Sequence, residues 1–258
     1  MVFTIACIIT TTAPNHFRLF WFWLRQQQKQ TPQVWHSIVI NHLRSNIMKK
    51  PKIKKLTNDE YRALPRISNS DLGKFENVVL KRPVKPSPLT AFSFGTAVHE
   101  LILEPNAIDK LPQDVDIAKV QTLAKTFWAE PWLKWLLRFS RKEEIVLWTC
   151  PVTGLPLKSK LDIILRGRTV YDIKTTSASS IEQFARFAVE YGYDRQAAFY
   201  MDSIGAKRFF FIALSKTKKN TVFVMEADNS FIESGRKKYR KLLSVWKQRN
   251  QPLPNTTT

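Results

Sequence analysis

The middle of the chain alternates apolar and polar residues as β-strands do. Three such segments follow one another, with the sequences EEIVLWTC, LKSKLDIIL and TVYDIKTT (residues 143–150, 157–165 and 169–176). The intervening PVTGLP and RGR contain the Gly and Pro residues typical of turns. The pattern predicts a three-stranded antiparallel meander, and RFFFIALS and TVFVMEA (residues 208–215 and 221–227) predict two more strands.

Helical spacing of apolar residues surrounds these strands. Ser68 and Ser70 precede an apolar-periodic stretch, as the N-cap of a helix does. The segment FSFGTAVHELILEP, residues 92–105, predicts a short buried helix that ends before its final proline. Three further helices are predicted over residues 181–189, 191–203 and 230–249, the last with a dense basic face that fits either a solvated surface or a phosphate-contacting one.

Residues 106–142 are predicted to be mainly helical. Trp128, Trp132 and Trp135 recur there at i, i+4 and i+7. We expect this stripe to pack in the core, because aromatic residues at helical spacing are more often core than a stacking surface for nucleobases.

The first 47 residues differ from the rest. A short apolar run, MVFTIACIIT, precedes Pro14, and no span reaches the roughly 20 apolar residues that a membrane helix requires. Met48 opens the basic sequence MKKPKIKK, which resembles a natural start. We therefore expect residues 1–47 to be a non-native or disordered extension from an upstream start codon, with a secretory signal peptide as the alternative. Residues 48–250 are expected to form a single domain, and residues 251–258 a disordered tail.

The net charge indicates a polyanionic partner. The 258 residues contain 41 Lys and Arg against 21 Asp and Glu, a formal net charge of +20. Residues 90–206 hold fourteen of each sign, so the excess lies on the two flanks, as in a metal-dependent nuclease, although charge alone also fits an anionic membrane surface or an acidic protein. Two isolated cysteines and the lack of Gly-rich phosphate-binding motifs argue against a disulfide framework, a zinc finger and nucleotide cofactors, and favour a reducing, cytoplasmic setting.

Acidic residues and a lysine fall on two neighbouring predicted strands. Asp162 is predicted to end one strand, and Asp172 and Lys174 lie on the next. The period of two puts Asp172 and Lys174 on one face and Ile173 on the other. Two carboxylates suit Mg²⁺ or Mn²⁺, and a nearby ammonium can offset charge that develops at a phosphodiester. Taken alone, the D-x-K pattern also fits an exposed ion pair.

The order of short motifs resembles a known group of enzymes. ISNSDL, FGTAVHELILEP, TGLPLKSKLD, DIKTT before a helix, and YGYDRQAAFY follow one another between Ile67 and Ala227. This series resembles the PD-(D/E)XK nuclease superfamily, specifically the exonuclease VIII (RecE) group with lambda exonuclease and the RecB nuclease domain. The resemblance implies an α/β (α+β), restriction-endonuclease-like fold with a central mixed sheet flanked by helices.

The resemblance also implies roles for individual residues. His99, which alone would be taken for a core histidine, would bind a metal together with Asp162, Asp172 and the backbone carbonyl of Ile173, and Lys174 would be the catalytic lysine. Supporting residues of the site or of DNA binding would be Gln196 and Tyr200 (a QxxxY motif, otherwise an ordinary helix pair), Thr175, Ser68, Ser70, and Glu143, although Glu144 is adjacent and the choice between the two stays open. Leu161 stands where the family often has proline or arginine.

The implied activity is that of a Mg²⁺-dependent exodeoxyribonuclease, with Mn²⁺ as a substitute. It would degrade one strand of linear double-stranded DNA, 5′ to 3′, and leave single strands for recombination or annealing. A ring-shaped homo-oligomer, a single-strand annealing protein as partner, no membrane association and a bacterial cytoplasmic, phage- or prophage-encoded setting would accompany it. The alternatives are a nuclease of the same fold acting on single-stranded or flapped DNA, and a catalytically silent DNA-binding module.

Overall fold

A computed structural model covers the chain and describes residues 51–82, 89–106, 108, 111–112, 114–217 and 219–249, the side chains of residues 89–92 excepted. The chain divides into two compact units, Met1–Met48 and Lys49–Thr258. The first unit and the last residues of the second lie outside the described residues. The predictions for residues 1–47 and 251–258 therefore concern parts of the chain that the structure does not describe.

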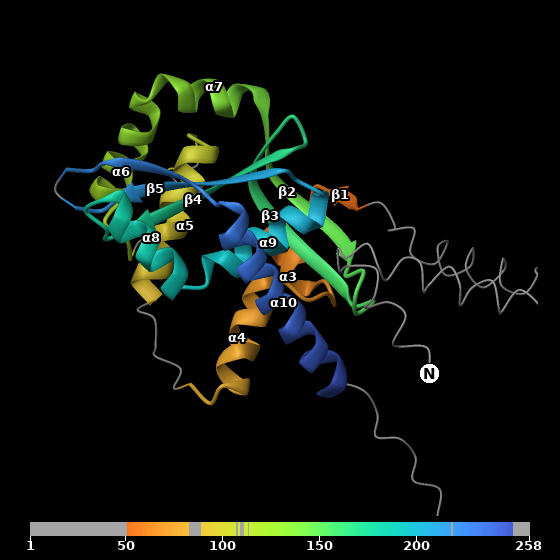
Figure 1. Cartoon of the computed structure of the whole chain (residues 1–258). Coiled ribbons are helices and arrows are strands. Elements are labelled where there is room, and N and C mark those ends of the chain that lie inside the picture. The colour runs from red at the N-terminus through yellow and green to blue at the C-terminus, as the bar shows by residue number, and fades with distance from the viewer. Residues whose placement is uncertain are drawn as a thin grey trace, which may run out of the picture. The chain divides into compact units, whose positions relative to one another are not determined.

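A six-stranded mixed sheet forms the centre of the second unit (Figure 1). Its strands follow the chain in the order β1-β2-β3-β4-β5-β6, and β4 and β5 run parallel while the other neighbours are antiparallel. The predicted meander and the two later strands are confirmed. The strands are β1 (Lys52–Lys54), β2 (Ser140–Thr149), β3 (Pro156–Leu165), β4 (Thr169–Thr176), β5 (Arg208–Ser215) and β6 (Val222–Glu226).

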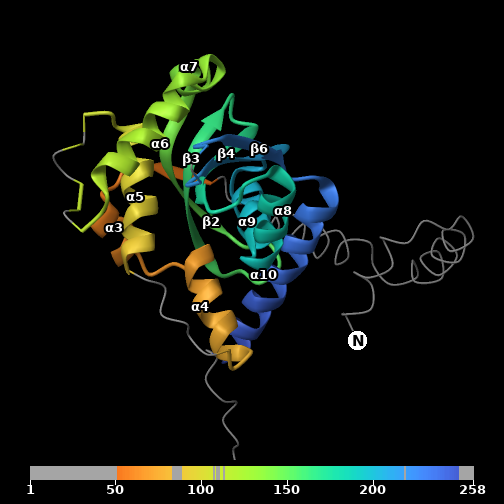
Figure 2. The same cartoon turned by 90° about the vertical axis from the view of Figure 1, so that its left-hand side faces the viewer.

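Helices cover both faces of this sheet. Figure 2 shows α5 and α6 on one side and α8, α9 and α10 on the other. The predicted α/β arrangement of a mixed sheet flanked by helices is therefore confirmed. The described helices are α3 (Asn58–Ala63), α4 (Asn69–Val79), α5 (Leu89–Leu103), α6 (Ile117–Ala129), α7 (Pro131–Phe139), α8 (Ile181–Glu190), α9 (Tyr193–Ile204) and α10 (Asn229–Arg249). None of the helices in the described ranges is both long enough and apolar enough to cross a bilayer.

Alternate residues of the central strands supply two separate cores. On β5, Phe209 and Phe211 join the core beneath α4, α9 and α10, whereas Ile212 and Leu214 join the core beneath α5, α6 and α7. On β4, Val170 belongs to the first core and Ile173 to the second. This alternation is the period of two that the sequence shows, so each strand buries both of its faces.

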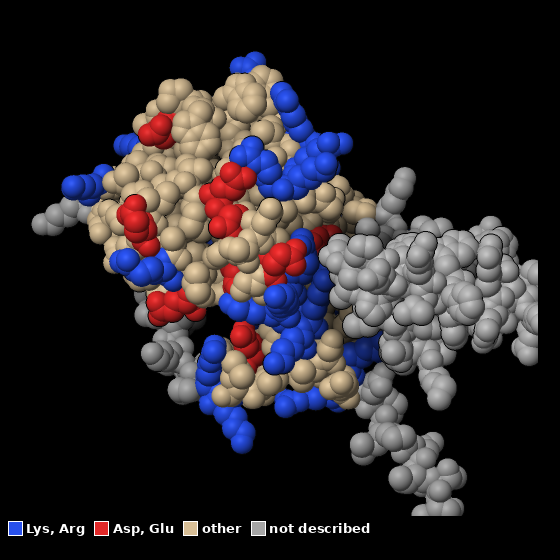
Figure 3. Space-filling model, in the orientation of Figure 1, with Lys and Arg blue, Asp and Glu red and all other residues tan. Residues whose placement is uncertain are grey.

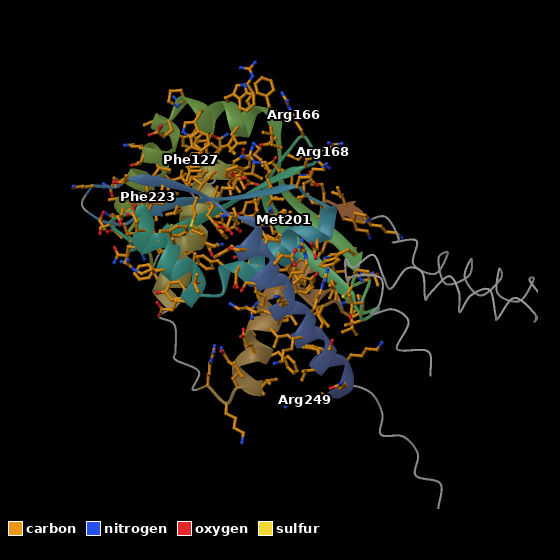
Figure 4. All side chains as sticks on the ribbon, in the orientation of Figure 1. Phe127, Arg166, Arg168, Met201, Phe223 and Arg249 are labelled. Carbon is orange, nitrogen blue, oxygen red and sulfur yellow. The ribbon has the colours of Figure 1, made fainter. Side chains whose placement is uncertain are left out.

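The turn between β3 and β4 is tight and basic, as predicted. Arg166 and Gly167 have φ angles of 50° and 67°, in the left-handed region, and the N–H of Arg168 donates to the carbonyl of Leu165 at 3.2 Å. Positive φ values let the strands reverse within three residues. Figure 4 shows Arg166 and Arg168 at this turn, and Arg249 at the C-terminal end of the described residues.

The prediction that the tryptophan stripe packs in the core is wrong. Trp132 is 39% exposed and Trp135 is 48% exposed, whereas Trp128 is partly buried against the second core. The reason is a helix break, because Pro131 begins a new helix and the three residues do not share one helical face. Residues 106–142 are also less helical than predicted, since β2 already begins at Ser140.

Helices α9 and α10 pack very closely at one point. A Cβ atom added to Gly235 would lie 1.8 Å from the backbone carbonyl oxygen of Asp194, so only glycine fits. Asp202 on α9 anchors the same contact, since its carboxylate accepts hydrogen bonds from Arg236 at 2.6 Å and from the Tyr239 hydroxyl at 2.5 Å. Half-buried and paired, Asp202 has a structural role that its position near the motifs did not reveal.

Much of the basic face of α10 is used within the fold. Figure 3 shows Lys and Arg side chains gathered over α10, with Asp and Glu side chains among them. Lys238 pairs with Asp194 at 2.6 Å, and Lys247 donates to the carbonyl of Thr153 at 2.8 Å. Lys237 is exposed. Some of the basic side chains of α10 therefore anchor the helix to the fold, so its basic face is not wholly available to solvent or phosphate.

We expect Gly235→Ala to destabilise the protein by about 3 kcal/mol or more, because the added methyl group collides with backbone that cannot move aside. Chemical denaturation monitored by circular dichroism measures this change. Lys237→Ala, an exposed change on the same helix, should stay within about 0.5 kcal/mol of wild type. Equal stability of the two variants would show that α9 and α10 are not packed this closely.

Candidate active site

The pairing between strands β3 and β4 ends next to Asp162. Their paired residues end at Ile163 and Tyr171, and beyond that point the N–H of Ile173 donates to the Asp162 carboxylate at 2.8 Å. Leu161 and Ile163 are two residues apart, yet they enter different cores, so the pleat is interrupted between them. The side chain of Asp162 thus takes over a hydrogen bond that the interrupted ladder leaves open.

The position of Asp162 in its strand differs from the prediction. We expected it to end the strand, but β3 continues to Leu165. The paired residues Ile163 and Tyr171 set a register that brings Asp162 opposite Asp172, so the two carboxylates converge, as predicted, from within two strands. A sequence pattern does not show where a ladder opens while the strand continues.

Strand β2 is irregular at the same level. The β2–β3 ladder pairs the neighbours on either side but not Glu143 with Asp162, and Glu143 has a φ of 52°, an uncommon conformation for a residue with a side chain. Its carboxylate lines the cleft and pairs with Lys160 at 2.7 Å. Glu144 is 6% exposed and lies 3.5 Å from Lys55. Of the two adjacent acids, Glu143 is the one at the cleft.

His99 on α5 contacts Asp162 directly. Its Nε2 atom lies 2.7 Å from the Asp162 Oδ2 atom. Burial by itself would lower the pKa of His99, but the charges of Asp162 and Asp172 and the hydrogen bond to Asp162 raise that pKa overall. Burial would likewise raise the pKa of Asp162, yet His99, Lys174 and the N–H of Ile173 hold it below its usual value. The two groups therefore stabilise each other's charged forms.

Asp172 and Lys174 share one face of β4, as the period of two predicts. They form an ion pair, while Ile173 between them is buried in the opposite core. The Gln196 side-chain amide, on α9, donates to Asp172 Oδ1 at 3.0 Å. Gln196 thus positions Asp172, which in turn pairs with Lys174. Tyr200, one turn further along α9, lines the same cleft.

Burial and charge set the protonation of this pair. Burial raises the pKa of Asp172 to about 6, and the negative charge of Asp162 adds to the rise, while Lys174 opposes it. Burial would lower the pKa of Lys174, but the charges of Asp172, Tyr193 and Asp162 raise it overall. Its ammonium also lies 5.0 Å from the centroid of the Tyr193 ring, a cation–π contact. Lys174 is therefore held in its charged form.

These side chains open onto one cleft of about 630 Å³. Nine predicted site residues line it: His99, Glu143, Asp162, Asp172, Ile173, Lys174, Thr175, Gln196 and Tyr200. Ser68 and Ser70, both within the described residues, lie outside its lining. Ser68 is the N-cap of α4, where it accepts from the N–H of Asp71 at 3.2 Å, and Ser70 is exposed in the first turn of that helix. Ser68 therefore has a capping role.

Seven lining residues were not among the predicted site residues: Asn58, Arg62, Gly95, Thr96, Glu100, Lys160 and Tyr193. Asn58 and Arg62 reach the cleft from α3, a short helix that begins with a capping box formed by Thr57 and Glu60. Tyr193 reaches it from the first turn of α9. Its spacing of three residues before Gln196 puts both on one side of a helix, which is the only sequence signal that could have revealed it.

The donor atoms fit a hard divalent cation. Asp162, Asp172 and the carbonyl of Ile173 supply oxygens, with His99 beside them, although no three His, Cys, Asp or Glu side chains of the described ranges are gathered as a closed set of ligands. Burial, and to a lesser extent the negative charge of Asp162, penalise the ionised form of Asp172 and raise its pKa. A divalent cation would remove that penalty, so the arrangement of charges suits one.

Comparison with known proteins places this geometry in context. Residues 75–254 match the family described as a PDDEXK-like domain of unknown function (DUF3799). The predicted PD-(D/E)XK resemblance is thereby confirmed. No curated protein sequence matches the chain.

One solved structure shares the fold at low sequence identity, and two others match with TM-scores below 0.5. A putative exonuclease from Eubacterium rectale is 15% identical, with a TM-score of 0.54 over 80% of this chain and 97% of that one. A phage related exonuclease from Haemophilus somnus 129PT is 10% identical, with a TM-score of 0.37 over 76% and 89%. An alkaline exonuclease from Laribacter hongkongensis is 13% identical, with a TM-score of 0.36 over 75% and 95%.

We expect Mg²⁺ or Mn²⁺ to raise the melting temperature of the protein, by roughly 5 °C or more at a concentration about 100 times the dissociation constant. The shift should vanish in Asp162→Asn, which loses a donor oxygen and half of the paired negative charge. Glu190→Gln removes an exposed carboxylate elsewhere and should keep the shift. Differential scanning calorimetry with and without EDTA measures it, and an equal shift in both variants would place the metal outside this cleft.

Proposed function

Because the chain belongs to the family of PDDEXK-like domains DUF3799, we propose that it is a metal-dependent nuclease that hydrolyses DNA in the cleft between β3, β4, α5 and α9. One observation carries the proposal. The carboxylates of buried Asp172 and half-buried Asp162 line a single cleft with the ammonium of Lys174, and the protein around them has a formal net charge of +20. Acids in the cleft suit a cation, and bases elsewhere suit a phosphate backbone.

The residues that line the cleft have separate parts in this chemistry. A bound divalent cation supplies an activated water and polarises the phosphoryl oxygen. Asp162, Asp172 and the Ile173 carbonyl would hold that cation, with His99 fixing Asp162. Lys174 places positive charge where the phosphodiester gains negative charge during hydrolysis.

Second contacts keep the reacting groups in place. Gln196 orients the Asp172 carboxylate through its hydrogen bond of 3.0 Å, and Tyr193 lies against the ammonium of Lys174. Thr175 lines the cleft beside that lysine, and Glu143 lines it from β2. These residues would therefore act by positioning, whereas Lys174 would be the catalytic residue.

The proposed substrate is the end of linear double-stranded DNA, of which one strand is degraded 5′ to 3′. The order of motifs supports this exonuclease activity, and the name of the E. rectale neighbour, a putative exonuclease, agrees with it. Mg²⁺ is the proposed metal, with Mn²⁺ as a substitute. The single strand left by the nuclease would serve recombination or annealing. The protein would act as a homo-oligomeric ring, with a single-strand annealing protein as its partner. Its setting would be the bacterial cytoplasm, encoded by a phage or prophage. Each of these is part of the proposal.

We expect the full-length protein to release nucleotides from linear duplex DNA in Mg²⁺, with early loss of a 5′ label and late loss of a 3′ label. EDTA should abolish the release. Lys174→Ala should slow it about 100-fold or more, because one electrostatic contact to the transition state is lost. Lys125→Ala removes an exposed lysine of α6 and should leave it unchanged.

Other outcomes would distinguish the alternatives. Faster cleavage of single-stranded or flapped DNA than of blunt duplex would favour a different nuclease of the same fold. Tight binding that persists in EDTA, with no cleavage in Mg²⁺, would overturn the nuclease proposal and leave a DNA-binding module.

A further inference from the structure

A second, smaller hollow adjoins the cleft. Its volume is about 120 Å³, and it lies where β4 ends and α8 begins to cover the sheet. Thr175 and Tyr193 line both hollows. The two hollows therefore adjoin at these two residues.

One side of the small hollow is aromatic. Phe184 and Tyr193 belong largely to the core, since Phe184 is 1% exposed and Phe211 stacks on Tyr193 with ring centroids 5.6 Å apart. Tyr191 is different, because its side chain is 58% exposed. Its ring centroid lies 5.8 Å from that of Phe187 and 5.9 Å from that of Tyr193. An exposed tyrosine alone needs no explanation, but this one stands at a hollow that adjoins the cleft.

The other side of the small hollow is polar. Thr175, Thr176, Ser177 and Lys216 line it. The Thr176 hydroxyl already accepts from the N–H of Ala178 at 3.1 Å, and the Lys216 ammonium lies 5.7 Å from the centroid of the Phe94 ring. The backbone N–H of Lys216 donates to the carbonyl of Thr176 at 2.7 Å, so the carboxyl ends of the parallel strands β4 and β5 are tied together here. In open sheets with parallel strands, ligands bind at this end. The hollow thus combines an aromatic side with a polar side that carries hydrogen-bonding groups.

We propose that this hollow binds one unpaired nucleobase of the DNA strand whose phosphodiester bond lies in the cleft. A base has apolar faces that stack on aromatic rings and polar edges that accept hydrogen bonds, which matches the two sides of the hollow. The volume suits one planar group rather than a whole nucleotide. The proposal rests on the proposed function, because it assumes that DNA occupies the cleft.

The chemistry of the lining defines the substrate further. The described lining residues offer hydroxyl groups and an ammonium but no amide or carboxylate that would select one base. Any of the four bases can therefore enter, and recognition is by stacking rather than by sequence. A base held in the hollow cannot be paired in a duplex. The nucleotide beside the scissile bond must therefore leave its partner strand before cleavage.

Photo-cross-linking locates the base directly. Duplex DNA with 5-iodouracil at the terminal nucleotide of either the 5′ or the 3′ end is bound to the full-length protein in EDTA, or in Ca²⁺ to prevent cleavage, and irradiated. Mass spectrometry should find the cross-link from one of the two ends on the peptide that contains Tyr191. Tyr191→Phe keeps an aromatic ring and should keep that cross-link.

Affinity for the same duplex, measured by fluorescence anisotropy, tests the contribution of the ring. Tyr191→Ala should weaken binding by about fivefold or more, the lower end of what stacking of one base contributes. Val189→Ala is a matched control on α8, because Val189 is equally exposed, at 58%, and does not line the hollow. Its affinity should equal that of wild type.

Two results would overturn the base-binding proposal: cross-links found only outside the small hollow, or equal affinities of Tyr191→Ala and wild type. Cleavage of end-labelled DNA in Mg²⁺ is measured separately. A cross-link at Tyr191 without any cleavage would count against the nuclease activity and leave the base site standing. Cleavage without that cross-link would do the reverse.

Discussion

The hydrogen bond from the Ile173 N–H to the Asp162 carboxylate is the contact on which the site depends. It forms where β3 and β4 stop pairing, and a buried N–H without an acceptor would cost about 1–3 kcal/mol. A carboxylate therefore replaces a strand carbonyl, and the strands can diverge without losing that free energy. The divergence makes room for a cleft inside a continuous sheet. The same carboxylate contacts His99, so one side chain stabilises the fold and defines the candidate metal site.

Charges in the cleft constrain one another in a similar way. Asp172 is buried, while Asp162, Lys174 and His99 are half-buried beside it, and each pair partly offsets the cost of removing its charges from water. Helix α9 contributes Gln196 and Tyr193 to this arrangement while also packing in the core. The position of α9 is in turn fixed by α10 through Gly235 and Asp202. A helix remote from the cleft thus determines where the supporting side chains lie.

The cleft and the small hollow adjoin along β4, and their linings fit two different parts of a nucleotide. Carboxylates and a lysine gather where a phosphodiester would lie, and aromatic rings with hydroxyl groups gather next to it. Thr175 and Tyr193 form the boundary between the two environments. Both hollows have lining residues on β4, at and beyond the point where its pairing with β3 ends.

The sequence by itself determined every strand except β1, most helices, the mixed α/β class and the shared face of Asp172 and Lys174, because the periods of 2 and 3.6 are local properties of the chain. Order and spacing of short motifs identified the superfamily. Tertiary structure alone decided that Glu143 rather than Glu144 reaches the cleft, that Arg62 lines it, and that Trp135 is exposed. The first two outcomes depend on a backbone irregularity and on contacts between segments far apart in the chain, and the third depends on how the helix that begins at Pro131 packs. Periodicity carries no information about any of these three.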